Sequence, residues 1–111
     1  MKLKLGAFEE LVLLAVGSLG EEAYGVSVSL LLEEKSGKKP SVGALHAAFY
    51  RLEEKGCVIS RQGGATAARG GRRKRFYVLT NLGRNALMEA SQLRMALSEN
   101  IKELQLGLNE G

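Results

Sequence analysis

The stretch SVGALHAAFYRLEEKGCVIS (residues 41–60) combines a helix signal with a strand signal, and it decides the fold of this chain. Ser41 is a typical N-cap residue, because its hydroxyl oxygen can accept a hydrogen bond from a backbone N–H group of the first turn. Apolar residues then recur at intervals of three, four and three residues, at Val42, Leu45, Phe49 and Leu52. This spacing predicts a helix with one buried face. Gly56 predicts the end of that helix, and CVIS predicts a strand after it.

Two further helices are predicted on the N-terminal side of this stretch. Residues 7–19 carry apolar residues at helical spacings and are almost entirely apolar after Glu10, so we expect this helix to be largely buried. In residues 25–35, Val26, Leu30 and Leu31 supply the apolar stripe of a shorter helix. The sequence SGKKP follows, and its glycine and proline predict a turn.

A hairpin and a long helix are predicted on the C-terminal side. RFYVL (residues 75–79) is a second strand, and the loop 62–74 before it is longer than most hairpin loops, which indicates a function for the loop. Thr80 is the expected cap of the last helix. Its apolar residues are spaced by 3, 4, 4, 3 and 4, at Ala90, Leu93, Leu97, Ile101, Leu104 and Leu108. One helix cannot bury such a seam alone: it needs its own domain or a partner chain, and a chain of 111 residues leaves little domain to cover it, which favours a partner chain.

The predicted order of helix, helix, helix, hairpin and helix is that of a winged helix-turn-helix. The fold class is therefore mainly α with a small β-hairpin (α+β), extended by a long C-terminal dimerisation helix. We expect residues 1–80 to form the winged-helix DNA-binding domain and residues 81–111 to form the dimerisation helix. In this architecture the third helix enters the major groove of DNA.

The charge of the chain is concentrated in one segment. The chain has 111 residues and a net charge of +4, yet residues 61–75 contain six cations and no acid, which leaves 10 cations against 12 acids in the rest. A near-neutral protein with one basic segment is typical of a local anion-binding surface, and nucleic acid is the leading partner. The alternatives are a solvated charge run and a nuclear-localisation tract.

The third predicted helix has a face opposite its apolar stripe that we expect to contact DNA. It consists of small residues at the start and polar residues further along: Ser41, Gly43, Ala44, His46, Ala47, Tyr50 and Arg51. The small residues allow a close approach, His46 and Tyr50 can reach base edges, and Arg51 is better placed for phosphate. In the wing we expect DNA contacts from Arg69, Gly70, Gly71, Arg72, Arg73, Lys74 and Arg75. The alternative for the helix is an ordinary solvated face.

The composition disfavours an enzyme. His46 is the only histidine, Cys57 is the only cysteine, and the chain has no aspartate, so we expect no catalytic site, no metal and no cofactor. Cys57 is expected to be a core thiol, with a redox-sensing thiol as the alternative. Tyr24 is expected in the core, with a place in an effector pocket as the alternative.

The sequence also carries expectations about location. The apolar run near the N-terminus contains Glu9 and Glu10 and does not resemble a signal peptide, and the longest uncharged run, residues 11–20, is too short to span a bilayer. One cysteine fits a reducing compartment. We therefore expect a cytoplasmic protein without a membrane segment.

Three stretches resemble the PadR family of bacterial transcriptional regulators. They are FEELVLLAVGSLGEEAYG (residues 8–25), SVGALHAAFYRLEEKGCVIS, and GRRKRFYVLTNLG (residues 71–83), and the resemblance covers roughly residues 5–87. The residues that match the family pattern are Gly43, Leu45, Arg51, Leu52, Glu53, Gly56, Gly71, Arg73, Arg75, Tyr77, Leu79, Thr80 and Gly83. His46 and Ala47 replace a usual tyrosine and proline, so an operator sequence cannot be transferred. The resemblance implies a dimer formed by the C-terminal helix and allows an unknown small-molecule effector at its interface.

These observations lead to one hypothesis and two alternatives. We expect a homodimeric, sequence-specific DNA-binding transcriptional regulator that acts as a repressor on a pseudo-palindromic operator. The alternatives are a coiled-coil adaptor whose basic loop binds an acidic partner, and a protein that binds double-stranded RNA.

Overall fold

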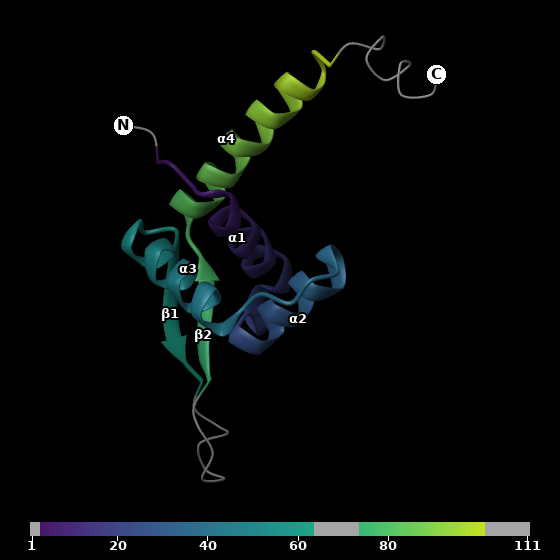
Figure 1. Cartoon of the computed structure of the whole chain (residues 1–111). Helices are drawn as coiled ribbons and strands as arrows, with labels where there is room; N and C mark the ends of the chain where they lie inside the picture. The colour runs from purple at the N-terminus through teal and green to yellow at the C-terminus, as the bar shows by residue number, and fades with distance from the viewer. Residues whose placement is uncertain (1–2, 64–73, 102–111) are drawn as a thin grey trace.

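The computed structural model describes residues 3–63 and 74–101, and it has the predicted order of elements (Figure 1). The elements are α1 (Ala7–Leu19), the 3₁₀ turn η1 (Gly20–Glu22), α2 (Gly25–Ser36), α3 (Val42–Glu54), β1 (Val58–Gln62), β2 (Arg75–Leu79) and α4 (Asn81–Ser98). The three first helices and the antiparallel β1–β2 hairpin form one body, and α4 projects away from it. The predicted winged helix-turn-helix fold, mainly α with a small hairpin, is confirmed.

The helix boundaries follow from local signals. Ser41 Oγ accepts a hydrogen bond from the Ala44 N–H at 3.1 Å and caps α3. Thr80 Oγ1 accepts from the Gly83 N–H at 3.0 Å, and its hydroxyl donates to the Gly56 carbonyl at 2.6 Å. Gly56 has φ of 78°, the left-handed conformation in which glycine ends a helix without strain. The caps predicted at Ser41, Gly56 and Thr80 are therefore present.

The core lies between α1, α2, α3 and the inner side of the hairpin. Its buried residues include Val12, Leu13, Val16, Val28, Leu45, Ala48, Phe49, Leu52, Cys57, Val58 and Tyr77. The Phe49 and Tyr77 rings stack across the core with centroids 3.9 Å apart, and the Tyr77 N–H donates to the Ala23 carbonyl at 2.8 Å. Thus β2 is held both by α3 and by the segment that leads into α2.

Some expected core residues are exposed instead. Val42 is 68% exposed, and the buried face of α3 includes Ala48 in its place. In α2, Val28 is buried, while Val26 and Leu30 of the expected stripe are exposed. The physical reason is that Val26, Leu30 and Val42 line an open groove between α2 and α3, which no described residue fills.

The expectation that α1 is largely buried is wrong for one side of the helix. Leu11 is 48% exposed and Leu14 is 46% exposed, because α2, α3 and β2 cover only the opposite side. No helix of the described residues combines the length and the apolarity needed to cross a bilayer.

A buried carboxylate joins the start of α1 to the end of α3. Glu9 is only 6% exposed, and its oxygens accept hydrogen bonds from Arg51 Nε at 2.8 Å, Lys55 Nζ at 2.6 Å and the Gly6 N–H at 3.0 Å. Burial opposes ionisation of this carboxyl, but the hydrogen bonds from Lys55, Gly6 and Arg51 outweigh it and lower the pKa of Glu9. Since Lys55 Nζ also donates to the Lys4 carbonyl, the N-terminal segment is tied to the same cluster.

Replacing Glu9 by glutamine tests the contribution of this cluster. We expect Glu9→Gln to lower the free energy of unfolding at pH 7 by about 1–2 kcal/mol, since it removes two charge-assisted hydrogen bonds whose cations are partly exposed. Because the folded protein lowers the pKa of Glu9 below its ordinary value of 4.5, this stabilisation is complete above that value and disappears as the pH falls through the folded pKa. Urea unfolding from about pH 3 to about pH 7, a range that includes the ordinary carboxyl pKa, measures both effects.

Glu33→Gln, at an exposed position of α2, is the matched control and should behave like the wild type. Equal unfolding free energies for Glu9→Gln and the wild type at neutral pH would contradict the proposed role of the cluster.

Candidate nucleic-acid interface

The outward face of α3 presents the residues expected to contact DNA. Ser41, Gly43, Ala44, His46, Tyr50 and Arg51 are exposed, and Ala47 is half-buried. They lie opposite the buried face formed by Leu45, Ala48, Phe49 and Leu52. A Cβ placed on Gly43 would meet no atom within 4 Å, so the start of this face is open. The helix therefore has the two-sided character that the sequence predicts.

His46 lies where α3 meets both α2 and the hairpin. It lines a concave surface together with residues 24–26 at the entry to α2, and with Lys74 and Arg75 at the entry to β2. The N-terminus of α2 adds N–H groups that have no partner within the helix, and the positive end of the helix dipole. Both N–H groups and cations favour an anion such as a phosphate group.

The base of the wing is built from alternating rings and cations. Tyr24 packs edge-on against Phe76 with ring centroids 5.3 Å apart. Lys74 Nζ lies 4.4 Å from the Tyr24 ring centroid, and the Arg61 guanidinium lies 5.1 Å from the Phe76 centroid, where cation–π attraction is effective. These contacts position two cations at the loop end of the hairpin, which is the base of the wing, while leaving them exposed.

The pairing of β1 with β2 extends as far as the residues next to the loop. Gln62 pairs with Arg75, and the Gly63 N–H donates to the Lys74 carbonyl at 2.7 Å, one step beyond the last strand pair. Of the expected wing contacts, Lys74 and Arg75 are described and exposed. The others, Arg69, Gly70, Gly71, Arg72 and Arg73, lie outside the described residues.

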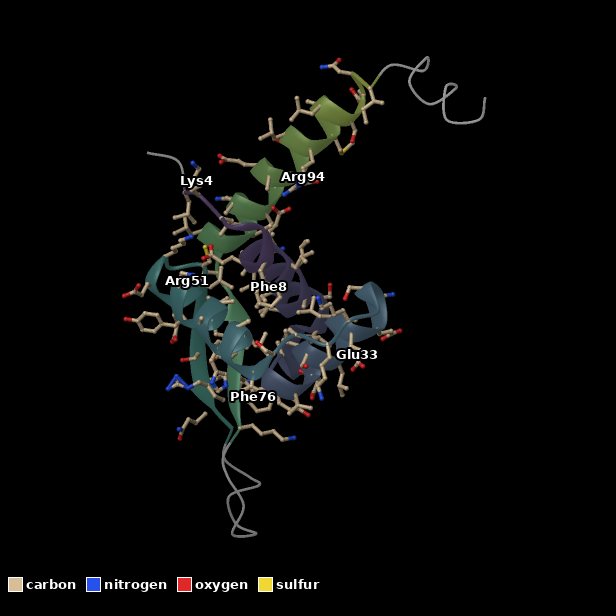
Figure 2. All side chains as sticks on the ribbon, viewed as in Figure 1. Lys4, Phe8, Glu33, Arg51, Phe76 and Arg94 are labelled. Carbon is tan, nitrogen blue, oxygen red and sulfur yellow. The ribbon has the colours of Figure 1, made fainter. Side chains whose placement is uncertain are left out.

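Arg51 makes an ion pair that stabilises the fold and is also exposed at the surface. Its Nε donates to Glu9, yet its side chain, which extends from α3 (Figure 2), is 54% exposed. At the preceding position, a hydrogen bond to the Glu54 carboxylate raises the pKa of Tyr50, whose hydroxyl is the donor to that acid. The C-terminal end of α3 thus carries an acid next to Tyr50, whereas its start carries only small residues at Gly43 and Ala44.

Sequence reasoning missed several residues of this surface. Three roles were not expected: Glu9 pairs with Arg51, the Tyr24 ring contacts Lys74, and Arg61 lies at the wing base. No spacing pattern could have found the Glu9–Arg51 pair, since its members are 42 residues apart. Tyr24 is half-buried at the edge of the core, between the two interpretations that the sequence left open.

The expected dimer seam is exposed along α4. Leu93 is 61% exposed and Leu97 is 60% exposed, while Ala90 is half-buried. Ile101 is 55% exposed and lies three residues past the end of α4, and Leu104 and Leu108 lie outside the described residues. A groove next to the seam is lined by Leu3, Leu5, Glu10, Ala86, Ala90, Leu93, Arg94 and Leu97.

One ion pair holds α4 beside α1. Arg94 donates to both carboxylate oxygens of Glu10, from Nη2 at 2.8 Å and from Nε at 3.0 Å, and this bidentate hydrogen bond lowers the pKa of Glu10 (Figure 2). Nearer the body, Gly83 packs so closely that a Cβ there would lie 2.3 Å from the Cys57 carbonyl oxygen. The direction of α4 is therefore set at two points.

The described residues contain no group of three His, Cys, Asp or Glu side chains that could hold a metal ion. Cys57 is fully buried, and burial raises the pKa of its thiol. A thiol held in its protonated form is a poor nucleophile, which agrees with a core role and not with a redox sensor.

Comparison with known proteins identifies the family. The family model described as "Transcriptional regulator PadR-like family" matches residues 12–89. The chain belongs to the PadR-like family. Members of this family are transcriptional regulators that bind DNA, and not enzymes. The resemblance stated from the sequence motifs is thus confirmed.

Solved structures of two PadR-family proteins and of RosR share the fold. A PadR-like transcription factor from Bacteroides fragilis has a TM-score of 0.71 at 23% identity, with 85% of each chain covered. A PadR family transcription regulator from Clostridium difficile has a TM-score of 0.70 at 26% identity, with 85% of this chain and 93% of the other covered. RosR from H. salinarum has a TM-score of 0.65 at 27% identity, with 90% of this chain and 81% of the other covered. No curated protein sequence matches the chain.

Proposed function

We propose that this PadR-like protein is a cytoplasmic, homodimeric repressor that binds a pseudo-palindromic DNA operator. The observation that carries the proposal is the concave surface on which His46 of α3 meets Lys74 and Arg75 of the wing base. Because α3 and the wing base line the same concave surface, one DNA duplex would contact both: α3 in the major groove and the wing along the flanking backbone.

The division of labour within the proposed site follows side-chain chemistry. His46 and Tyr50 would approach base edges, and the exposed part of Arg51 would approach a phosphate group, with its orientation set by Glu9. Lys74 and Arg75, with the cations of the preceding loop, would neutralise phosphates. The proposal therefore keeps residues 1–80 as the DNA-binding domain.

Residues 81–111 would form the dimer contact. Leu93 and Leu97 expose most of their apolar side chains on α4, and a second copy of α4 is the partner whose own seam would cover them. Two-fold symmetry then places two α3 helices on two half-sites of one duplex. Occupation of a promoter by such a dimer would exclude the polymerase sterically, which is the basis for proposing a repressor.

Selection from a random pool of DNA duplexes tests the central proposal. We expect the full-length protein to enrich inverted half-sites whose centres are about 10 base pairs, or a multiple of that distance, apart. An adaptor that binds acidic proteins would enrich no duplex. A protein that binds double-stranded RNA would release its DNA in competition with RNA duplexes, so the three functions give three different outcomes.

Removing wing charge tests the backbone contacts. The triple substitution Arg72→Ala, Arg73→Ala, Lys74→Ala should weaken binding to all duplexes and reduce the slope of log K against log salt by about 0.9 for each phosphate that is no longer neutralised, because fewer counterions are released. Titration at several salt concentrations measures the slope. As a control, Arg84→Ala removes an exposed cation from α4 and should leave the salt slope unchanged. An unaltered slope in the triple variant would contradict the wing assignment.

Charge placed on the seam tests the dimer. The double substitution Leu93→Arg, Leu97→Arg should give a monomer with poor operator binding, since the two α4 helices would then oppose four buried cations. Sedimentation equilibrium measures the mass. The control is Met88→Arg, Met95→Arg, because both methionines are exposed on the other side of α4, at 53% and 59%. A seam variant that still sediments as a dimer would rule out this interface.

A further inference from the structure

An apolar groove lies beside the start of α3, next to the residues expected to read DNA. It has a volume of about 230 Å³ and is lined by the apolar residues Val26, Leu30, Pro40, Val42 and Leu45. Val42 is 68% exposed, Val26 is 60% exposed and Leu30 is 55% exposed. A cluster of exposed aliphatic groups at a binding surface indicates that the partner brings apolar groups to it.

The basic residues around the groove indicate the charge of its partner. Lys39 and His46 line the groove itself, and His46 also lines the adjoining concave surface with Lys74 and Arg75. A partner that covers both surfaces must therefore be anionic and must present apolar groups next to its charges. Duplex DNA meets both conditions, because its backbone is anionic and the thymine C5-methyl group is an apolar group on the major-groove edge.

The start of α3 is poorly equipped for other base contacts. Gly43, Ala44 and Ala47 have no polar side-chain atoms, so they cannot donate to guanine or accept from cytosine. The only arginine of α3, Arg51, commits its Nε to Glu9. Contact with methyl groups is therefore the form of base readout that these small residues leave room for, beside the polar side chain of His46.

We propose that Val42, backed by Val26 across the groove, contacts a thymine methyl group, so that each half-site carries thymine beneath the start of α3. This inference rests on the proposed DNA-binding function and adds a specificity-determining residue to it. Val42 was expected in the core and not among the DNA contacts, and its exposure is what assigns it this role.

Deoxyuridine substitution provides the test, because deoxyuridine differs from thymidine only by the missing methyl group. In a duplex obtained by selection, each thymine of one half-site is replaced in turn by uracil. We expect the wild-type protein to lose about fourfold in affinity at one or two positions, which corresponds to exposing one buried methyl group. Val42→Ala should bind the thymine duplex more weakly and should bind the thymine and uracil duplexes equally.

The matched control is a valine-to-alanine substitution outside the groove. Val78→Ala removes the same two methyl groups from a partly exposed valine of β2 and should keep the full preference for thymine. Val42→Thr retains the shape of the side chain and should reduce the preference without affecting the fold, which separates methyl contact from loss of structure. The thermal unfolding midpoints of the variants check that they are folded.

Each other outcome has one meaning. If the wild type binds a selected duplex but does not distinguish thymine from uracil, or if Val42→Ala still distinguishes them, the inference is wrong while the proposed function stands. If the Val26 and Val42 methyl NMR signals do not shift on adding the duplex, the groove belongs to another occupant, such as an apolar helix of a protein partner, and the inference is wrong. If no duplex is bound at all, the proposed function itself fails.

Discussion

The stacked pair Phe49–Tyr77 is the contact on which the geometry of the proposed interface depends. It joins the buried face of α3 to the inner face of β2, with ring centroids 3.9 Å apart. Since the Tyr77 N–H also binds the Ala23 carbonyl at 2.8 Å, the same residue ties the hairpin to the entry of α2. The helix α3, the wing base and the N-terminus of α2 are thereby held at one place, which is the surface proposed to bind a DNA duplex.

Charged residues divide between the fold and the surface in a consistent way. Glu9 and Glu10 are adjacent in sequence, yet Glu9 holds the end of α3 through Arg51 and Lys55, whereas Glu10 holds α4 through Arg94. One short acidic segment of α1 thus orients both the helix proposed to read DNA and the helix proposed to form the dimer. Lys74 and Arg75, which are exposed near the wing, have no such structural acid among the ion pairs of the described residues.

The apolar residues of α3 also divide into a buried set and an exposed one. Leu45, Phe49 and Leu52 of α3 are buried in the core, while Val42, on the first turn of the same helix, is exposed beside Val26. In an ordinary amphipathic helix a single exposed valine needs no explanation, but here it extends an uncovered groove at a cationic surface. The boundary between core and interface runs through α3 itself.

The elements and their ends could be predicted from the sequence alone, because caps, glycines and apolar periodicity act within a few residues of each other: Ser41, Gly56 and Thr80 end or begin elements as their chemistry requires. The outward face of α3 followed from the same periodicity. Only the tertiary structure decided which apolar residues are covered, since Val26 and Val42 have core-like patterns but no described element packs over them. It also decided the partners of Glu9, Tyr24 and Arg94, because these contacts join residues far apart in the chain, and no local pattern records them.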